Sequence, residues 1–207
     1  MCGIAGLWAP GMAPHERLSL VDGMLARMRH RGPDGAAVWD GDGTAIGITR
    51  LAIVAPTVPA RVYSSESGRI HAVVNGEIYN HESLLEGLRA RGHEVERGPD
   101  TTVIPHLYEE DGADFPVRLD GMFAVALWDA DRRRLVLARD RAGEKPLFHT
   151  VAPGRFAFAS EPGALAALPW VSREPAAGAL ARYLAHGFFA GRDSAFRAIH
   201  QLPPAHV

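Results

Sequence analysis

The chain has 207 residues and a formal net charge of −2, with 47% hydrophobic and 22% charged residues, which is the composition of a globular domain large enough to bury a core. This charge gives no electrostatic basis for binding nucleic acid or an anionic membrane, and no apolar stretch is long enough to span a bilayer. The single cysteine excludes an internal disulfide framework, and the N-terminus lacks the basic and apolar regions of a signal peptide, so we expect a cytoplasmic protein.

The first predicted element is a strand at residues 2–8, and it contains the only cysteine, Cys2, directly after Met1. Because the second residue is small, removal of Met1 would leave Cys2 with both a thiol and a free α-amino group. Such an amine titrates near neutral pH and can serve as the base that activates the nucleophile of its own residue. Taken alone, Cys2 is better explained as a small apolar residue of the strand.

The next elements are a helix and two strands. Apolar residues at helical spacing predict a helix at 16–29, and a turn rich in glycine and proline closes it at 29–35 (RHRGPDG). Strands are predicted at 36–40 and 44–49, and the second of them ends at Arg50. An arginine at a strand end is common, so Arg50 by itself does not indicate a site.

The rest of the chain continues without regular strand–helix–strand alternation. A strand at 70–76 runs into the turn-like segment 75–80 (NGEIYN), and either Asp100 or Thr101 precedes a helix as its N-cap. Further helices are predicted at 80–91, 101–110 and near 178–186, and further strands at 122–129, 134–139 and 155–160. This order predicts a layered α+β domain with mostly antiparallel sheets instead of a doubly wound parallel sheet.

Several of these segments together resemble one family. Residues 1–4 (MCGI), 29–34 (RHRGPD), 75–80 (NGEIYN) and 137–143 (LARDRAG) occur in the order and at the spacing of the glutaminase domain of class II glutamine amidotransferases, the N-terminal-nucleophile type. Residues 119–124 (LDGMFA), 145–148 (KPLF) and 159–161 (ASE) extend the resemblance, which is strongest to the asparagine synthetases. It implies a four-layer αββα fold with two packed, mostly antiparallel sheets.

The resemblance also implies a domain organisation. A glutaminase domain would cover 2–165, and 166–207 would form a C-terminal extension leading towards a synthetase domain. Beyond residue 162 the chain is rich in Ala, Pro and Gly, and 201–207 (QLPPAHV) reads as a crossing segment. The Ser-Gly-Gly pyrophosphate loop of the synthetases does not occur in this sequence. We therefore expect either a stand-alone amidotransferase domain or a piece of a longer polypeptide.

The implied activity is hydrolysis of the glutamine side-chain amide to glutamate and ammonia. By resemblance, Cys2 forms a γ-glutamyl thioester, and its α-amino group relays a proton to the departing ammonia. The Asn75 side chain and the backbone N–H of Gly76 match the donors that stabilise the oxyanion. A glycine at position 76 is sensible because a backbone donor needs unobstructed approach.

The resemblance also implies which residues bind the glutamine substrate. Arg50 matches the residue that binds the α-carboxylate of glutamine, Glu77 and Asp100 match those that receive its α-ammonium group, and backbone groups near Leu51 and Ile53 complete the pocket wall. Arg29, His30 and Arg31 match a loop that shapes the floor beneath Cys2.

The sequence also departs from the asparagine synthetases at a few positions. Ile48 replaces a histidine that is usual there, Pro99 replaces a common serine, and Ala142 and Glu144 replace bulky apolar residues. Because relatives bury that last turn towards the partner domain, Glu144 indicates altered docking.

We expect no metal site and no cofactor, because the ten histidines occur singly and without the His-x-x-x-His spacing. The expected partners are glutamine and a synthetase domain or protein that receives the ammonia, and a homodimer stays open as an assembly. Two alternative functions also stay open. One is acyl transfer to another acceptor, or cleavage of another γ-glutamyl amide. The other is a non-catalytic structural module, as in the β-lactam synthetases.

Overall fold

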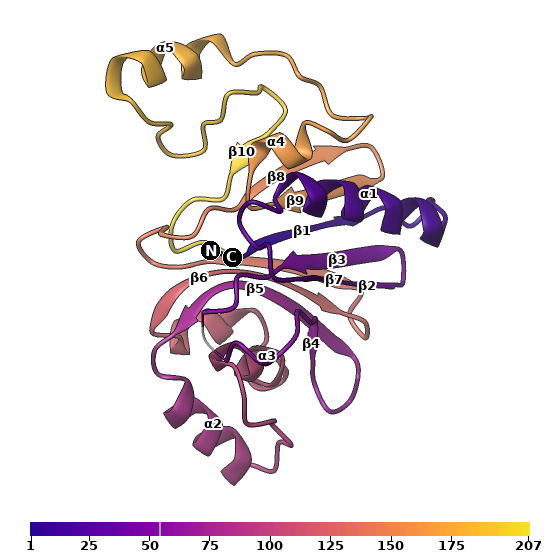
Figure 1. The fold of residues 1–207 in the computed structure, drawn as a ribbon, viewed down its shortest axis with the longest axis vertical. Coiled ribbons are helices and arrows are strands. Elements are labelled where there is room, and N and C mark those ends of the chain that lie inside the picture. Colours follow the sequence, from indigo (N-terminus) through magenta and orange to yellow (C-terminus); the bar gives the residue numbers. More distant parts are fainter. Residues whose placement is uncertain (54) are drawn as a thin grey trace.

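A computed structural model describes residues 1–53 and 55–207 of the chain, and in it two antiparallel sheets lie face to face (Figure 1). The larger sheet has the strand order β10-β8-β9-β1-β3-β2 and the smaller one the order β4-β5-β6-β7. The strands of the larger sheet are β1 (Gly3–Trp8), β2 (Ala36–Gly41), β3 (Thr44–Thr49), β8 (Phe148–Ala152), β9 (Arg155–Ala159) and β10 (His200–Gln201). Those of the smaller sheet are β4 (Tyr63–Ser64), β5 (Ile70–Ile78), β6 (Gly121–Asp129) and β7 (Arg134–Arg139).

Helices cover the outer face of each sheet. The larger sheet is covered by α1 (Pro14–Arg27) and α4 (Pro162–Leu165), whose apolar residues share one core cluster with β1, β3 and β9. The smaller sheet is covered by α2 (His81–Ala90), the 3₁₀-helix η1 (Asp100–Val103), α3 (Ile104–Asp111) and the 3₁₀-helix η2 (Gly112–Arg118). The predicted α+β fold with four αββα layers is confirmed.

The alternation of side chains along each strand builds the cores. On β6, Phe123, Val125 and Leu127 pack against the helices of the smaller sheet, whereas Ala124 and Ala126 face the other sheet. A strand buried on both faces is apolar at nearly every position, and the period of two divides its residues between the two cores. The small alanines of β6 allow the sheets to approach each other.

Strands and helices that rest on long apolar patterns were predicted to within about two residues, a normal uncertainty for element ends. The short strands β4, β8 and β10 were not predicted. They are short and partly exposed, and β8 exists because it pairs with β9 and β10. The predicted helix at 101–110 begins as η1 before α3, with Pro105 in the first turn of α3. The last predicted helix is α5 (Ala177–His186).

The C-terminal segment, residues 166–207, contributes a strand to the larger sheet. β10 pairs with β8, and Leu168, Val171 and Ile199 belong to the core cluster beneath α1. Near the C-terminal end, the backbone N–H of Arg139, the last residue of β7, donates to the carbonyl of His206 at 3.0 Å. The marks for the two chain ends lie next to each other in the view of Figure 1. A domain boundary after residue 165 stays a prediction. Among the described residues, no helix has the length and apolar content required to cross a membrane.

The same substitution is expected to act in opposite directions at two glycines. A Cβ at Gly6 on β1 would lie 2.6 Å from both the Ala45 carbonyl oxygen and the Phe158 ring, so Gly6→Ala should lower the free energy of unfolding by about 1–3 kcal/mol. At Gly23, inside α1, a Cβ would meet no neighbouring atom within 4 Å, so Gly23→Ala should raise that free energy by about 0.5–1 kcal/mol. Urea denaturation measures both, and changes of the same sign would contradict this account of the packing.

Candidate active site

A cavity opens where the first residues of β1, the end of β3 and the end of β5 meet, with a volume of about 150 Å³. Every residue that the sequence predicted for catalysis or glutamine binding lines it, and these are Cys2, Arg50, Leu51, Ile53, Asn75, Gly76, Glu77 and Asp100. The pairing of Gly3 with Thr49 places the residue before β1 next to the residues after β3. The residues of β5 reach the same point from the second sheet.

Leu51 and Arg31 hold Cys2 in place, Leu51 through its backbone and Arg31 through its side chain. The N–H of Leu51 donates to Cys2 Sγ at 3.4 Å, and Sγ in turn lies 3.9 Å from the Leu51 carbonyl oxygen. Arg31 Nε donates to the Cys2 carbonyl at 3.0 Å, and Arg31 Nη1 contacts Glu161 at 3.1 Å. His30 contacts the same carboxylate at 2.8 Å. The role of Arg29, His30 and Arg31 in shaping the loop beneath the cysteine stays a prediction.

Asn75 brings a buried amide to the cavity. Asn75 is 1% exposed. Among the residues that the structure describes, 1–53 and 55–207, no group forms a hydrogen bond with its Nδ2. A buried donor without a partner costs about 1–3 kcal/mol, a cost that a ligand oxygen at this point would remove. Next to it, a Cβ at Gly76 would lie 2.2 Å from the Met122 carbonyl oxygen. The structure thus gives a reason for glycine that differs from the predicted one, namely the close approach of β6.

Charged groups of both signs surround the cavity. Arg50 is 7% exposed, its backbone N–H donates to the Gly35 carbonyl at 2.8 Å, and its Nη2 donates to the Ala55 carbonyl at 2.8 Å. Asp100 is also buried and accepts a hydrogen bond from the Ile78 N–H at 2.5 Å. Burial raises the pKa of Asp100, and the hydrogen bond from Ile78 offsets this only in part. Glu77 adds a second carboxylate to the lining.

Lys145 also lines the cavity, and the sequence did not point to it. It is 7% exposed, and its Nζ lies 3.6 Å from Met1 Sδ. It is the only lysine in a chain whose other basic residues are arginines, a pattern that by itself indicates compositional bias and not a site. Ile48, which stands where the asparagine synthetases usually have a histidine, also lines the cavity and is 5% exposed.

The loop that carries Lys145 is built around one buried carboxylate. Asp140 is 1% exposed and accepts hydrogen bonds from the N–H groups of Phe123, Ala142, Glu144 and Lys145 at 2.9–3.3 Å. Arg139 donates to the Lys145 carbonyl at 2.7 Å and to the Leu202 carbonyl at 2.6 Å. The motifs at 137–143 and 145–148 therefore shape the cavity rim and anchor the C-terminal crossing segment.

Comparison with known proteins identifies a family that spans the whole chain and relatives that cover most of it. The family described as "Glutamine amidotransferase domain" matches residues 1–207. Asparagine synthetase [glutamine-hydrolyzing] 3 of Bacillus subtilis (strain 168) is 39% identical over 173 residues, which is 82% of this chain and 28% of that protein. Asparagine synthetase [glutamine-hydrolyzing] 3 of Arabidopsis thaliana is 39% identical over 148 residues, which is 72% of this chain and 25% of that protein.

A solved structure shares the fold. Glutamine phosphoribosylpyrophosphate amidotransferase from B. subtilis, complexed with ADP and GMP, superposes with a TM-score of 0.64 at 22% identity, covering 79% of this chain and 43% of that one. The chain spans about a quarter of the length of the asparagine synthetases that it matches. The family match over residues 1–207 and the shared fold lead to one conclusion: this chain belongs to the glutamine amidotransferase domain family.

Proposed function

We propose that this domain hydrolyses the side-chain amide of glutamine to glutamate and ammonia through a thioester on Cys2. The observation that carries the proposal is the convergence, in one cavity, of the only thiol, a buried amide donor, an arginine and two carboxylates. These are the groups that a free amino acid with a side-chain amide requires.

The chemistry begins when Met1 is removed. The freed α-amino group of Cys2 accepts the thiol proton while sulfur attacks the side-chain carbonyl carbon of glutamine. Collapse of the tetrahedral intermediate breaks the C–N bond, and the same amine delivers the proton to the departing ammonia. Water then attacks the thioester and breaks the C–S bond, which releases glutamate and restores the thiol. Met1 lines the cavity, so its removal also enlarges the space beside Cys2.

The oxyanion requires donors that are in place before the reaction. The buried Nδ2 of Asn75 is suited to this task because it need not leave another partner when the intermediate forms. The backbone N–H of Gly76 is the second proposed donor. Both residues lie on β5, whose pairing with β6 over the full length of the strand holds them rigidly.

The other end of the substrate is a zwitterion. In this proposal Arg50 forms a forked pair of hydrogen bonds with the α-carboxylate, and Asp100 and Glu77 receive the α-ammonium group. Backbone groups of Leu51 and Ile53 form the wall of the pocket. A peptide-bound glutamine carries neither terminal charge, so this arrangement favours the free amino acid.

We further propose that the ammonia passes to a synthetase domain or protein. The relatives bearing the name asparagine synthetase are about four times as long as the matched region. Exposed apolar side chains in the C-terminal segment support a covering partner, since Leu184 is 84% exposed and Phe188 is 61% exposed. A homodimer stays a prediction.

Replacement of the nucleophile is the first test. Cys2→Ala should reduce glutaminase kcat by at least about 1000-fold, because no other group can form the thioester. Ammonia release is measured by a coupled assay after mass spectrometry has confirmed removal of Met1 from the unchanged protein. Equal activity of the two proteins would refute the proposal. A thioester in the unchanged protein that forms new amides when amines are added would favour acyl transfer over hydrolysis.

Truncation of the proposed oxyanion donor should affect the rate more than binding. Asn75→Ala removes a donor that acts on the developing charge, so we expect kcat to fall by about 100–1000-fold with little change in KM. Steady-state kinetics with glutamine separates the two parameters. A large rise in KM with unchanged kcat would show that Asn75 binds the ground state and the transition state equally, which contradicts a role specific to the oxyanion.

Asp100 should give glutamine binding a distinctive pH dependence. Binding of the α-ammonium requires the carboxylate, and burial raises the pKa of Asp100, so KM should rise as pH falls through that raised pKa, before ordinary aspartates protonate. Asp100→Asn should raise KM by about 10–100-fold and remove this pH dependence, since a charge-assisted hydrogen bond is lost. Asp114→Asn, at an exposed carboxylate on η2, is the matched control and should change neither quantity. An unaltered pH profile in Asp100→Asn would exclude this role.

A further inference from the structure

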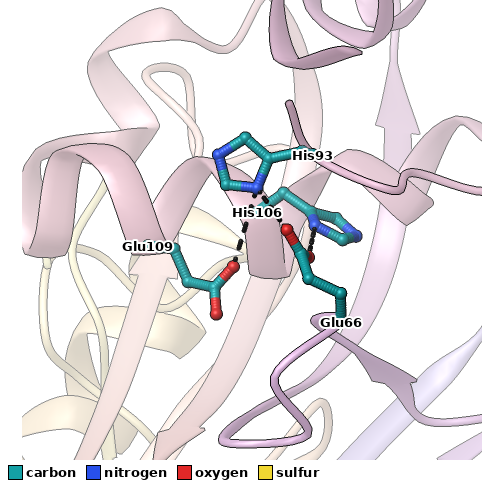
Figure 2. A group of neighbouring side chains, drawn as sticks. All are labelled: Glu66, His93, His106 and Glu109. Atoms are coloured by element: carbon teal, nitrogen blue, oxygen red, sulfur yellow. Dashed lines mark hydrogen bonds and ion pairs between the residues drawn. The ribbon is translucent and has the colours of Figure 1, made fainter. Parts of the chain in front are cut away.

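A cluster of histidines and glutamates lies on the helix-covered side of the smaller sheet, and none of its members lines the glutamine cavity. Glu66 comes from the turn between β4 and β5, His93 from the segment after α2, and His106 and Glu109 from α3 (Figure 2). One potential ligand atom from each residue lies within 4.8 Å of all the others. The sequence did not predict this group because the residues come from separate elements.

Local structure directs these side chains to one point. The β4–β5 turn is closed by the Ser65 N–H, which donates to the Ile70 carbonyl at 3.1 Å. The His93 N–H donates to the Leu88 carbonyl at 3.1 Å and so ties its segment to the end of α2. His106 and Glu109 are three residues apart on α3, a spacing that places them on the same face of a helix.

The Glu66 carboxylate lies between the two imidazole rings, as Figure 2 shows. Its Oε1 is 2.7 Å from His93 Nδ1, and its Oε2 is 2.5 Å from His106 Nδ1. Glu109 Oε2 approaches His93 Nδ1 to 3.8 Å. Both rings thus direct the same nitrogen towards one carboxylate, with a second carboxylate beside it.

His106 is the most buried member of the cluster, at 4% exposure. Its Nδ1 forms an ion pair with Glu66 Oε2 at 2.5 Å, although this contact does not meet the geometry of a hydrogen bond. An ion placed among these atoms would bind both Nδ1 and the carboxylate through their lone pairs.

The separations are close to those of a tetrahedral site. Zinc binds histidine nitrogen at about 2.0–2.1 Å and carboxylate oxygen at about 2.0–2.2 Å, so neighbouring ligand atoms lie about 3.3–3.5 Å apart. The atoms of this cluster range from 2.5 Å to 4.8 Å apart, so side-chain adjustments of about 1 Å would equalise them. Two imidazole nitrogens and two carboxylate oxygens form a donor set that suits Zn²⁺.

A further carboxylate lies behind one of the two imidazole rings. His93 Nε2 lies 3.4 Å from Glu110 Oε1, and Arg118 contacts the other oxygen of Glu110 at 2.9 Å. A carboxylate on the second ring nitrogen is the arrangement that orients metal-binding histidines.

We propose that Glu66, His93, His106 and Glu109 form a binding site for a divalent transition metal, with Zn²⁺ as the best-fitting ion. The metal would join the β4–β5 turn, the segment after α2 and the first turns of α3. Because η1 leads directly from Asp100 into α3, the same link would stabilise one wall of the glutamine cavity. The proposal does not depend on the glutaminase activity.

The test uses the full chain in the Cys2→Ala background, which removes the only thiol as a competing ligand. Zn²⁺ affinity is measured by competition with a chromophoric chelator, and Co²⁺ absorption reports the coordination number. We expect one equivalent of metal, four-coordinate Co²⁺, and a Tm increase of about 5 °C or more at a Zn²⁺ concentration about 100 times Kd. Zn²⁺ affinity should fall at least about 10-fold in both His93→Gln and Glu109→Gln.

His186→Gln, at an exposed histidine on α5, is the matched control and should leave the affinity unchanged. His106→Gln alters a buried residue and is expected to destabilise the fold as well as the site. Circular dichroism of every variant is therefore compared, and the two substitutions at His93 and Glu109, whose side chains are partly exposed, carry the test. Absence of stoichiometric binding, or an equal loss of affinity in His186→Gln, would overturn the proposal and leave the cluster as a set of ion pairs.

Discussion

The pairing of β1 with β3 is the constraint on which the site depends. The register sets Gly3 opposite Thr49, so the residue before one strand and the residues after the other emerge at the same edge of the sheet. A Cβ at Gly3 would lie 2.9 Å from Thr49 Oγ1, and one at Gly32 would lie 2.4 Å from the Thr49 carbonyl carbon. Glycines on both sides of Thr49 thus allow the turn after α1 to pack beneath Cys2. A shift of register by one residue would move the thiol away from Leu51 and Arg50.

The smaller sheet and its helices contribute the polar groups that face Cys2 across the cavity. β5 brings a buried amide with no hydrogen-bond partner among the described residues, and η1 brings a buried aspartate whose pKa is raised by burial. Both features carry an energetic cost in the free protein. Packing of the two sheets through Ile4, Val73 and Phe158 supplies the stability that allows such groups to be held in place. The cavity is therefore preorganised by the cores on either side of it.

The C-terminal half closes the rim of the same cavity. Asp140 organises the loop that presents Lys145, while Arg139 ties that loop to the crossing segment at Leu202. Between Lys145 and Leu202, Leu184 and Phe188 expose apolar surface. The segment that contains the proposed docking surface is thus tied at both ends to Arg139, through the carbonyls of Lys145 and Leu202. The histidine and glutamate cluster near α3 belongs to the other half of the molecule and reaches the cavity through η1.

The sequence by itself predicted a layered α+β domain, because long apolar alternation defines the central strands. Its resemblance to the class II glutamine amidotransferases implied the αββα layers and the residues that line the cavity. Only the tertiary structure decided the existence of β4, β8 and β10, the place of Lys145 in the cavity lining and the meeting of Glu66 with His93 and His106. Short strands acquire their conformation from a neighbouring strand, and their own residues carry too weak a pattern to predict it. Side chains from separate elements meet only after the chain has packed, so spacing along the sequence contains no record of their contact.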